Sequence, residues 1–347
     1  MKAVAKTRPG PGLEVIDIDR PRPLPHEVLL RVKACGACIN DIFLYQGKGI
    51  FTEMLESSLP AIIGHEFCGE IVELGIQVTG YSIGDRVVGE PTIACGECYL
   101  CKAGKSNICE NSVNLCKNIP GGMAEYVAVP SKGIHKVPPG IADVDASFAE
   151  SISVGTHALE RMPVLPGEPA AILGPGPIGL LLMQAVKAAG AYPVIMIGTS
   201  RSPRRLQTAK ELGADEVAVA DQGNLAQRIK ELTGNRGVPR VFEAAGAGKA
   251  VIDALAIASK GGQICLVGAA EEPVVMKYYS MLRVRELDLI SSRGRTPKNW
   301  DTALNLMASG KVRTGALTEF RLPLSDAIKG FQRMTENRDI LKLILEP

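Results

Sequence analysis

Four cysteines lie close together in "ACGECYLCKAGKSNIC", residues 94 to 109, with the spacing C-x2-C-x2-C-x7-C. Gly96 and Gly104 permit the backbone reversals that four thiolates need to converge on one tetrahedral ion. An all-cysteine set leaves no open position on the metal, which is typical of structural zinc. An iron–sulfur cluster also uses four thiolates, and disulfides need an oxidising compartment. The spacing favours zinc over these two alternatives.

A second group of metal-ligand types lies upstream. Cys38 in "CGACIND" is followed by His65 and Glu66 in "IIGHEFCGEIVELG". A thiolate, an imidazole and a carboxylate leave room on zinc for a substrate, which is typical of a catalytic site. Glu150 in "ASFAESISVG" is an acidic residue inside an apolar run, where an unpaired charge is costly. A lone histidine such as His65 is more often a core residue, but the agreement of these features favours a ligand.

The segment "AAILGPGPIGLLLMQAVKAAGA" predicts a dinucleotide site. It has the pattern G-x-G-x-x-G between an apolar strand and a helix-length run, which lets a pyrophosphate approach the N–H groups at a helix start. A plain Gly-Pro turn is the alternative, and the strand "PVIMIG" that follows argues against it. The predicted cofactor contacts are Gly174, Gly176, Pro177, Ile178 and Gly179.

The choice of cofactor depends on "GTSRSPRRL", residues 198 to 206. NAD enzymes usually place an acid near this point to accept hydrogen bonds from the ribose hydroxyls, and here Ser200 replaces it. Arg201 and Arg205 suit a 2′-phosphate, which guanidinium groups bind well. We therefore expect NADP to be favoured over NAD, although arginines at a helix start also commonly face solvent.

In this order and spacing, the motifs above together with "GDRVVGEP" resemble the zinc-containing medium-chain alcohol dehydrogenase family. Glu150, where other members carry a third ligand cysteine, is similar to the polyol (sorbitol) and threonine dehydrogenase-like branch. The resemblance implies that Cys38 and His65 bind the catalytic zinc, with Glu66 or Glu150 completing the shell. It also implies that Asp41 holds a ligand in its working orientation.

One residue departs from the family pattern. Many members carry a serine or threonine that passes on the substrate proton where this chain has Asn40, and an amide cannot lose a proton in that way. The relay is therefore expected to use Glu66, Glu150, an ordered water or His157.

The resemblance implies a reversible oxidation of a secondary alcohol to a ketone. Zinc would act as Lewis acid and the hydride would pass to NAD(P). A polyol, sugar alcohol or cyclitol is the expected substrate, and L-threonine is the alternative. A second alternative is a protein of another class, non-catalytic or quinone-reductase-like, that has the same fold but does not oxidise alcohols with zinc.

The whole chain of 347 residues, 46% hydrophobic, is long enough for two domains. We expect an α/β protein with a GroES-like β-barrel catalytic domain and a doubly wound parallel Rossmann domain over residues 151–286. The resemblance implies that the tail returns to the catalytic domain, which then comprises residues 1–150 and 287–347. Strand ends in the Rossmann domain predict four further cofactor contacts, Ala245, Val267, Gly268 and Ser292.

The net charge is only +2, from 39 basic and 37 acidic residues. This balance argues against binding to nucleic acid or to an anionic membrane. The nearly uncharged run from Pro169 to Gly198 is broken by glycine and proline, so strand, turn, helix and strand fit better than a membrane span. The N-terminus lacks a signal-peptide core. We expect a cytoplasmic homo-oligomer, a dimer or tetramer.

Overall fold

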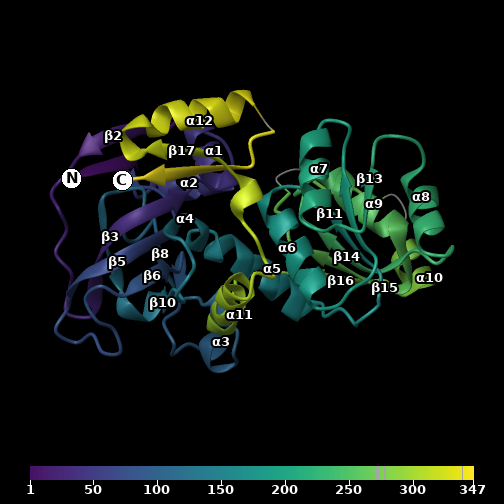
Figure 1. Cartoon of the computed structure of the whole chain (residues 1–347), viewed down its shortest axis with the longest axis horizontal. Helices are drawn as coiled ribbons and strands as arrows, with labels where there is room; N and C mark the ends of the chain where they lie inside the picture. Colours follow the sequence, from purple (N-terminus) through teal and green to yellow (C-terminus); the bar gives the residue numbers. More distant parts are fainter. Residues whose placement is uncertain (271–272, 277–278, 338) are drawn as a thin grey trace. The chain divides into compact units, whose positions relative to one another are not determined.

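The computed structural model describes residues 1–270, 273–276, 279–337 and 339–347. The chain divides into two compact units, and Figure 1 labels most of their helices and strands. The first unit comprises Met1–Glu150, Thr296–Ala308 and Leu317–Pro347, and the second comprises Ser151–Arg295 and Ser309–Ala316. Helix α5 (Ala149–Arg161) begins in the first unit and continues in the second.

The first unit is built on a mixed sheet. Within the described residues its strands follow the order β10-β6-β5-β3-β18-β17, and β9 also pairs with β3. Their bounds are β3 Glu27–Gly36, β5 Glu66–Leu74, β6 Arg86–Gly89, β9 Tyr126–Pro130, β10 Ile134–Lys136, β17 Thr318–Pro323 and β18 Lys342–Glu346. The C-terminal strand β18 runs antiparallel to β3, with Leu345 opposite Cys35, so the last residues of the chain lie beside the end of β3.

Smaller elements surround this sheet. Three short strands pair in the order β2-β1-β4, and β7 pairs with β8. The bounds are β1 Lys2–Lys6, β2 Glu14–Asp17, β4 Ala61–Ile62, β7 Thr92–Ile93, β8 Val113–Asn114, α1 Ile39–Gln46, α2 Ile50–Glu56, α3 Tyr99–Lys102, α4 Asp143–Ala146, α11 Pro297–Ala308 and α12 Ala327–Glu336. Among the described residues, the 3₁₀ turns are Ser106–Ile108, Ser131–Gly133, Gly315–Leu317 and Leu324–Asp326.

The core of the first unit follows from the alternation of its strands. β3, "EVLLRVKACG", buries most of its side chains because it is a central strand. Its Val28 and Leu30 pack with Phe67 of β5 and Phe331 of α12 in one buried cluster. Removing this apolar surface from water stabilises the packing of β3, β5 and α12 against one another.

The second unit contains a parallel sheet in the order β13-β12-β11-β14-β15-β16. The strands are β11 Ala170–Leu173, β12 Val194–Gly198, β13 Glu216–Val219, β14 Val238–Glu243, β15 Ala258–Leu266 and β16 Asp288–Ser291. The helices are α6 Pro177–Ala188, α7 Pro203–Glu211, α8 Leu225–Leu232, α9 Gly248–Ile257 and α10 Ser280–Arg285. This strand order confirms the predicted doubly wound sheet, whose order reverses between β11 and β14.

The uncharged run from Pro169 to Gly198 folds as β11, α6 and β12, as the glycines and prolines predicted. All residues of β11 and β12 are buried, which parallel strands covered on both faces require. In the part of the chain that the structure describes, every helix is too short or too polar to cross a membrane.

Candidate metal and cofactor sites

Cys38, His65 and Glu66 come together in the first unit. One ligand atom from each lies within 4.8 Å of the others. Cys38 is the N-cap of α1, two residues after the end of β3, and Glu66 is the first residue of β5, where it lies opposite Gly36 of β3. The antiparallel pairing of β3 and β5 therefore creates the group. A thiol, an imidazole and a carboxylate at this separation suit a zinc ion with an open position.

Asp41 binds the segment that carries Cys38. Its Oδ2 accepts a hydrogen bond of 2.9 Å from the Cys38 N–H, as the N3 acid of a capping box. Its Oδ1 is buried and has no hydrogen-bond partner among the described residues. Burial raises the pKa of the Asp41 carboxyl, and the nearby His65 lowers it by less. A carboxylate with one buried oxygen left over fits a residue that orients a metal ligand.

Lys342 also lies beside this group, although no motif in the sequence predicted it. Its Nζ forms an ion pair with Glu66 Oε2, and both side chains are almost fully buried, at 3% and 2% exposure. Burial alone would lower the pKa of Lys342, but the charges of Glu66, Cys38 and Glu150 raise it overall. The only sequence signal is a lysine inside the apolar strand "KLILE". One oxygen of Glu66 therefore faces a cation of the protein itself.

The other predicted catalytic residues are placed differently. Glu150 is buried at the start of α5, outside the group of three but near Lys342, whose pKa it raises. Asn40 is partly buried in the first turn of α1. His157 lies on the part of α5 that belongs to the second unit, with Nδ1 3.8 Å from Glu160 Oε2.

Cys116 is a further residue beside the metal-ligand group. Its backbone has φ +69°, a left-handed conformation unusual for a residue other than glycine. Its buried thiol lies 3.7 Å from the Gly64 carbonyl oxygen and hydrogen-bonds with His65. No spacing rule in the sequence marks this position.

The four cysteines of the lobe around α3 also converge. The Sγ atom of Cys95 lies 3.5 Å from that of Cys109 and 3.9 Å from that of Cys101. The Sγ atoms of Cys98 and Cys109 are 3.8 Å apart. Four sulfurs at about 2.3 Å from a tetrahedral zinc lie about 3.8 Å apart. All four are free thiols, and backbone N–H donation, chiefly from Cys101, lowers the pKa of Cys98 to about 6. The lobe fits zinc and contains no disulfide.

The glycine loop after β11 fits a pyrophosphate. Gly174 has φ +105°, and a Cβ there would lie 2.6 Å from the Ala245 nitrogen. A Cβ on Gly179 would lie 1.9 Å from the Gly174 carbonyl oxygen, whereas one on Gly176 would meet nothing within 4 Å. Gly176 is the N-cap of α6, with Pro177 and Ile178 in the first turn. The first and third glycines thus serve close packing, and the second leaves the helix start open to a ligand.

The remaining predicted cofactor contacts lie at strand ends of the second unit. Ser200 follows β12, Arg201 is exposed and Arg205 lies in the first turn of α7. Ala245, Val267, Gly268 and Ser292 follow the ends of β14, β15 and β16.

Glu243, at the end of β14, was not among the predicted residues. This buried carboxylate accepts hydrogen bonds from the N–H groups of Ala245 at 2.8 Å and Gly246 at 2.9 Å. These hydrogen bonds hold the backbone in place just after the carboxyl end of β14.

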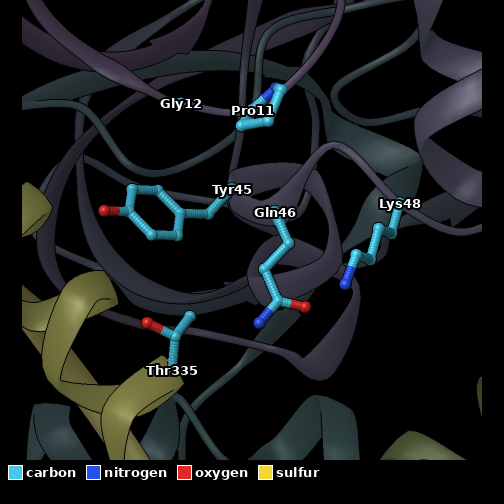
Figure 2. Close-up of a pocket in the computed structure, with 6 residues that line it drawn as sticks. All are labelled: Pro11, Gly12, Tyr45, Gln46, Lys48 and Thr335. Carbon is cyan, nitrogen blue, oxygen red and sulfur yellow. The ribbon is translucent and has the colours of Figure 1, made fainter.

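A separate cavity of about 430 Å³ lies in the first unit (Figure 2). Its walls include Tyr45 and Gln46 of α1 and Thr335 of α12, and none of the predicted site residues lines it. This pocket is therefore distinct from the metal-ligand group.

Comparison with known proteins assigns the family. Residues 24–139 match the alcohol dehydrogenase GroES-like domain, and residues 177–309 match the zinc-binding dehydrogenase domain. The sorbitol dehydrogenase of Halalkalibacterium halodurans is 33% identical over 100% of this chain and 99% of that protein. The chain belongs to the zinc-binding alcohol dehydrogenase family.

Other members of the family are similarly close. The L-threonine 3-dehydrogenase of Pyrococcus horikoshii is 32% identical over 99% of this chain and 95% of that protein. A solved zinc-binding dehydrogenase of Sinorhizobium meliloti, bound to NADP, is 30% identical with a TM-score of 0.88, over 100% of this chain and 99% of that one. The resemblance read from the motifs is confirmed, and so are the predicted fold and enzyme class.

Proposed function

We propose that this zinc-binding dehydrogenase oxidises a secondary alcohol of a polyol, sugar alcohol or cyclitol reversibly to a ketone, with NADP favoured over NAD. The observation that carries the proposal is the group of partly buried Cys38 and buried His65 and Glu66, in a chain that also has an open glycine loop at a helix start.

The site residues of the first unit then have defined roles. Cys38 and His65 hold the catalytic zinc, and Glu66 or Glu150 completes the set of ligands. Asp41 fixes the Cys38 segment, and Lys342 neutralises Glu66 so that the buried site does not carry an excess of negative charge. When bound, zinc polarises the substrate hydroxyl and the nicotinamide accepts the hydride.

The proton of the substrate hydroxyl needs an acceptor other than Asn40. Glu150 is our first choice because it is buried and lies near Lys342. Glu66 is the second choice because Lys342 already engages one of its oxygens.

The four cysteines of the lobe take no part in this reaction. They hold a second zinc that braces the lobe, since their sulfurs leave no open position on the ion. The protein therefore carries one catalytic and one structural zinc per chain.

NADP is supported by the lack of an acid at position 200 after β12, by Arg201 and Arg205 near the start of α7, and by the NADP-bound relative of Sinorhizobium meliloti. We further propose that the protein is a cytoplasmic homotetramer.

Threonine oxidation is the second candidate, since several relatives are named L-threonine 3-dehydrogenase. The retained ligand group argues against a non-catalytic or quinone-reductase-like protein.

The test is a substrate panel. The purified protein is incubated with sorbitol, other polyols, L-threonine and simple secondary alcohols, each with NAD and with NADP, and reduced nicotinamide is followed at 340 nm. The proposal predicts the highest kcat/KM with a polyol. Turnover confined to L-threonine would select the second candidate, and no turnover with any alcohol in zinc-loaded protein would refute both.

A further inference from the structure

Two adjacent strand ends in the second unit bring Ser200 and Asp221 together. β12 and β13 are parallel neighbours, and Gly198 lies opposite Val219. The Ala220 N–H extends the pairing by donating to the Gly198 carbonyl at 2.8 Å. Ser200 and Asp221 each follow their paired residue by two positions, so the register places them side by side.

The contact between them is specific. Asp221 Oδ1 accepts the Ser200 backbone N–H and Oδ2 accepts the Ser200 hydroxyl, both at 2.7 Å. The hydroxyl and N–H of Ser200, with a smaller contribution from the charge of Arg201, lower the pKa of the Asp221 carboxyl. Asp221 is therefore ionised at neutral pH, next to the position where an acid was expected and Ser200 was found.

We propose that Asp221 supplies from β13 the ribose-facing carboxylate that β12 lacks, and that it limits the preference for NADP by keeping NAD acceptable. The inference rests on the cofactor site of the proposed function. It adds a residue that was not among the predicted contacts.

The direction of the effect follows from hydrogen-bond chemistry. Because the Ser200 hydroxyl donates its proton to Asp221, its oxygen presents lone pairs to a ligand. Lone pairs accept a hydrogen bond from a ribose 2′-hydroxyl but repel a phosphate oxygen. The Asp221 charge repels a 2′-phosphate as well.

The nearby arginines act in the opposite sense. Arg201 is exposed and contributes to the lowered pKa of Asp221, so the two charges are close enough to offset each other. The balance between Arg201 and Asp221 then sets the ratio of affinities for the two cofactors.

The test uses two fragments that need no alcohol substrate. The full-length zinc-loaded protein is titrated by calorimetry with ADP-ribose and with 2′-phospho-ADP-ribose, for the wild type and for Asp221→Asn. We expect Asp221→Asn to raise the ratio of affinities in favour of the phosphorylated fragment by about three- to tenfold at low salt, with a smaller change at high salt. Arg201→Ala should move the ratio the other way.

Asp288→Asn is the matched control. Asp288 is exposed and hydrogen-bonds with Gln263 at 3.0 Å. It is the first residue of β16, so it lies at the amino end of its strand, whereas Ser200 and Asp221 follow the carboxyl ends of theirs. Asp288→Asn removes the same charge as Asp221→Asn and should leave the ratio of the two fragment affinities unchanged. If Asp288→Asn changed the ratio as much as Asp221→Asn, the effect would be one of net charge and the proposal would fall.

The two proposals fail in different ways. If both fragments bind but Asp221→Asn leaves the ratio unchanged, Asp221 has no role in discrimination while the proposed function stands. If neither fragment binds to the wild type, the dinucleotide site itself is wrong, and both proposals fall.

Discussion

Lys342 decides the charge of the metal-ligand group, although it lies far from the other members in sequence. It pairs with Glu66 where neither side chain reaches solvent, and Gly36 leaves them room, since a Cβ there would lie 2.7 Å from Glu66 Oε2. Removing one partner of a buried pair leaves the other charge uncompensated. The stability of this unit and the state of its metal site are therefore linked.

We predict that Lys342→Met lowers the free energy of unfolding by about 3 to 5 kcal/mol in urea titrations. The double variant Glu66→Gln, Lys342→Met removes both charges and should recover part of that loss. A single variant as stable as the wild type would show that the pair contributes nothing.

Cys116 offers a prediction about backbone strain. A left-handed residue with a Cβ costs roughly 1 to 2 kcal/mol compared with glycine, and Cys116 has φ +69°. Cys116→Ala and Cys116→Gly both remove the buried thiol, but only glycine removes the strain.

We therefore expect the glycine variant to be more stable than the alanine variant by about 1 kcal/mol, the reverse of the usual order. Thermal unfolding of the two proteins with equal zinc content measures this difference. An alanine variant of equal or greater stability would mean that the backbone of this loop is not strained.

At the scale of elements, the strand–loop–helix unit β11–α6 separates packing from ligand binding. Gly179 packs against the Gly174 carbonyl, whereas Gly176 faces open space with φ of −81°. Two alanine substitutions three residues apart therefore have different effects.

Gly176→Ala should keep the melting temperature of the wild type but weaken ADP-ribose binding about tenfold or more, because a methyl group occupies the approach of the pyrophosphate. Gly179→Ala should lower the melting temperature by several degrees, because the backbone must shift. Equal loss of binding and stability in both variants would contradict this division of roles.

The four-cysteine lobe gives a second prediction at this scale. Cys98→Ser removes one thiolate from the set, so the lobe should lose its ion and become susceptible to proteolysis between residues 93 and 113. Metal analysis should find one zinc fewer per chain, with the other retained. A variant that keeps its full zinc content would show that the lobe does not bind the metal.

The parts of the site that depend on local spacing in the sequence could be predicted. The lobe and the glycine loop are short motifs, so their ligands and their turn could be predicted from adjacent residues. Cys38 and His65 were predicted to meet because both are ligand types, and the β3–β5 pairing brings them together. Lys342 and Asp221 were missed because their positions depend on strand register, which no spacing in the sequence reveals.

At the scale of the whole molecule, the proposed function assigns two zinc ions with different roles to the two groups of ligand residues. Loss of the lobe ion should affect stability, and loss of the other should abolish alcohol oxidation. Cys98→Ser thus serves as the matched control for a substitution at Cys38.

The most direct measurement is therefore zinc content and alcohol turnover in the same preparations of wild type, Cys38→Ala and Cys98→Ser. We predict two zinc ions per chain in the wild type and one in each variant. Turnover should fall at least about 10³-fold in Cys38→Ala while Cys98→Ser, kept below its melting temperature, remains active. Cys38→Ala that oxidises the alcohol at the wild-type rate would contradict the account.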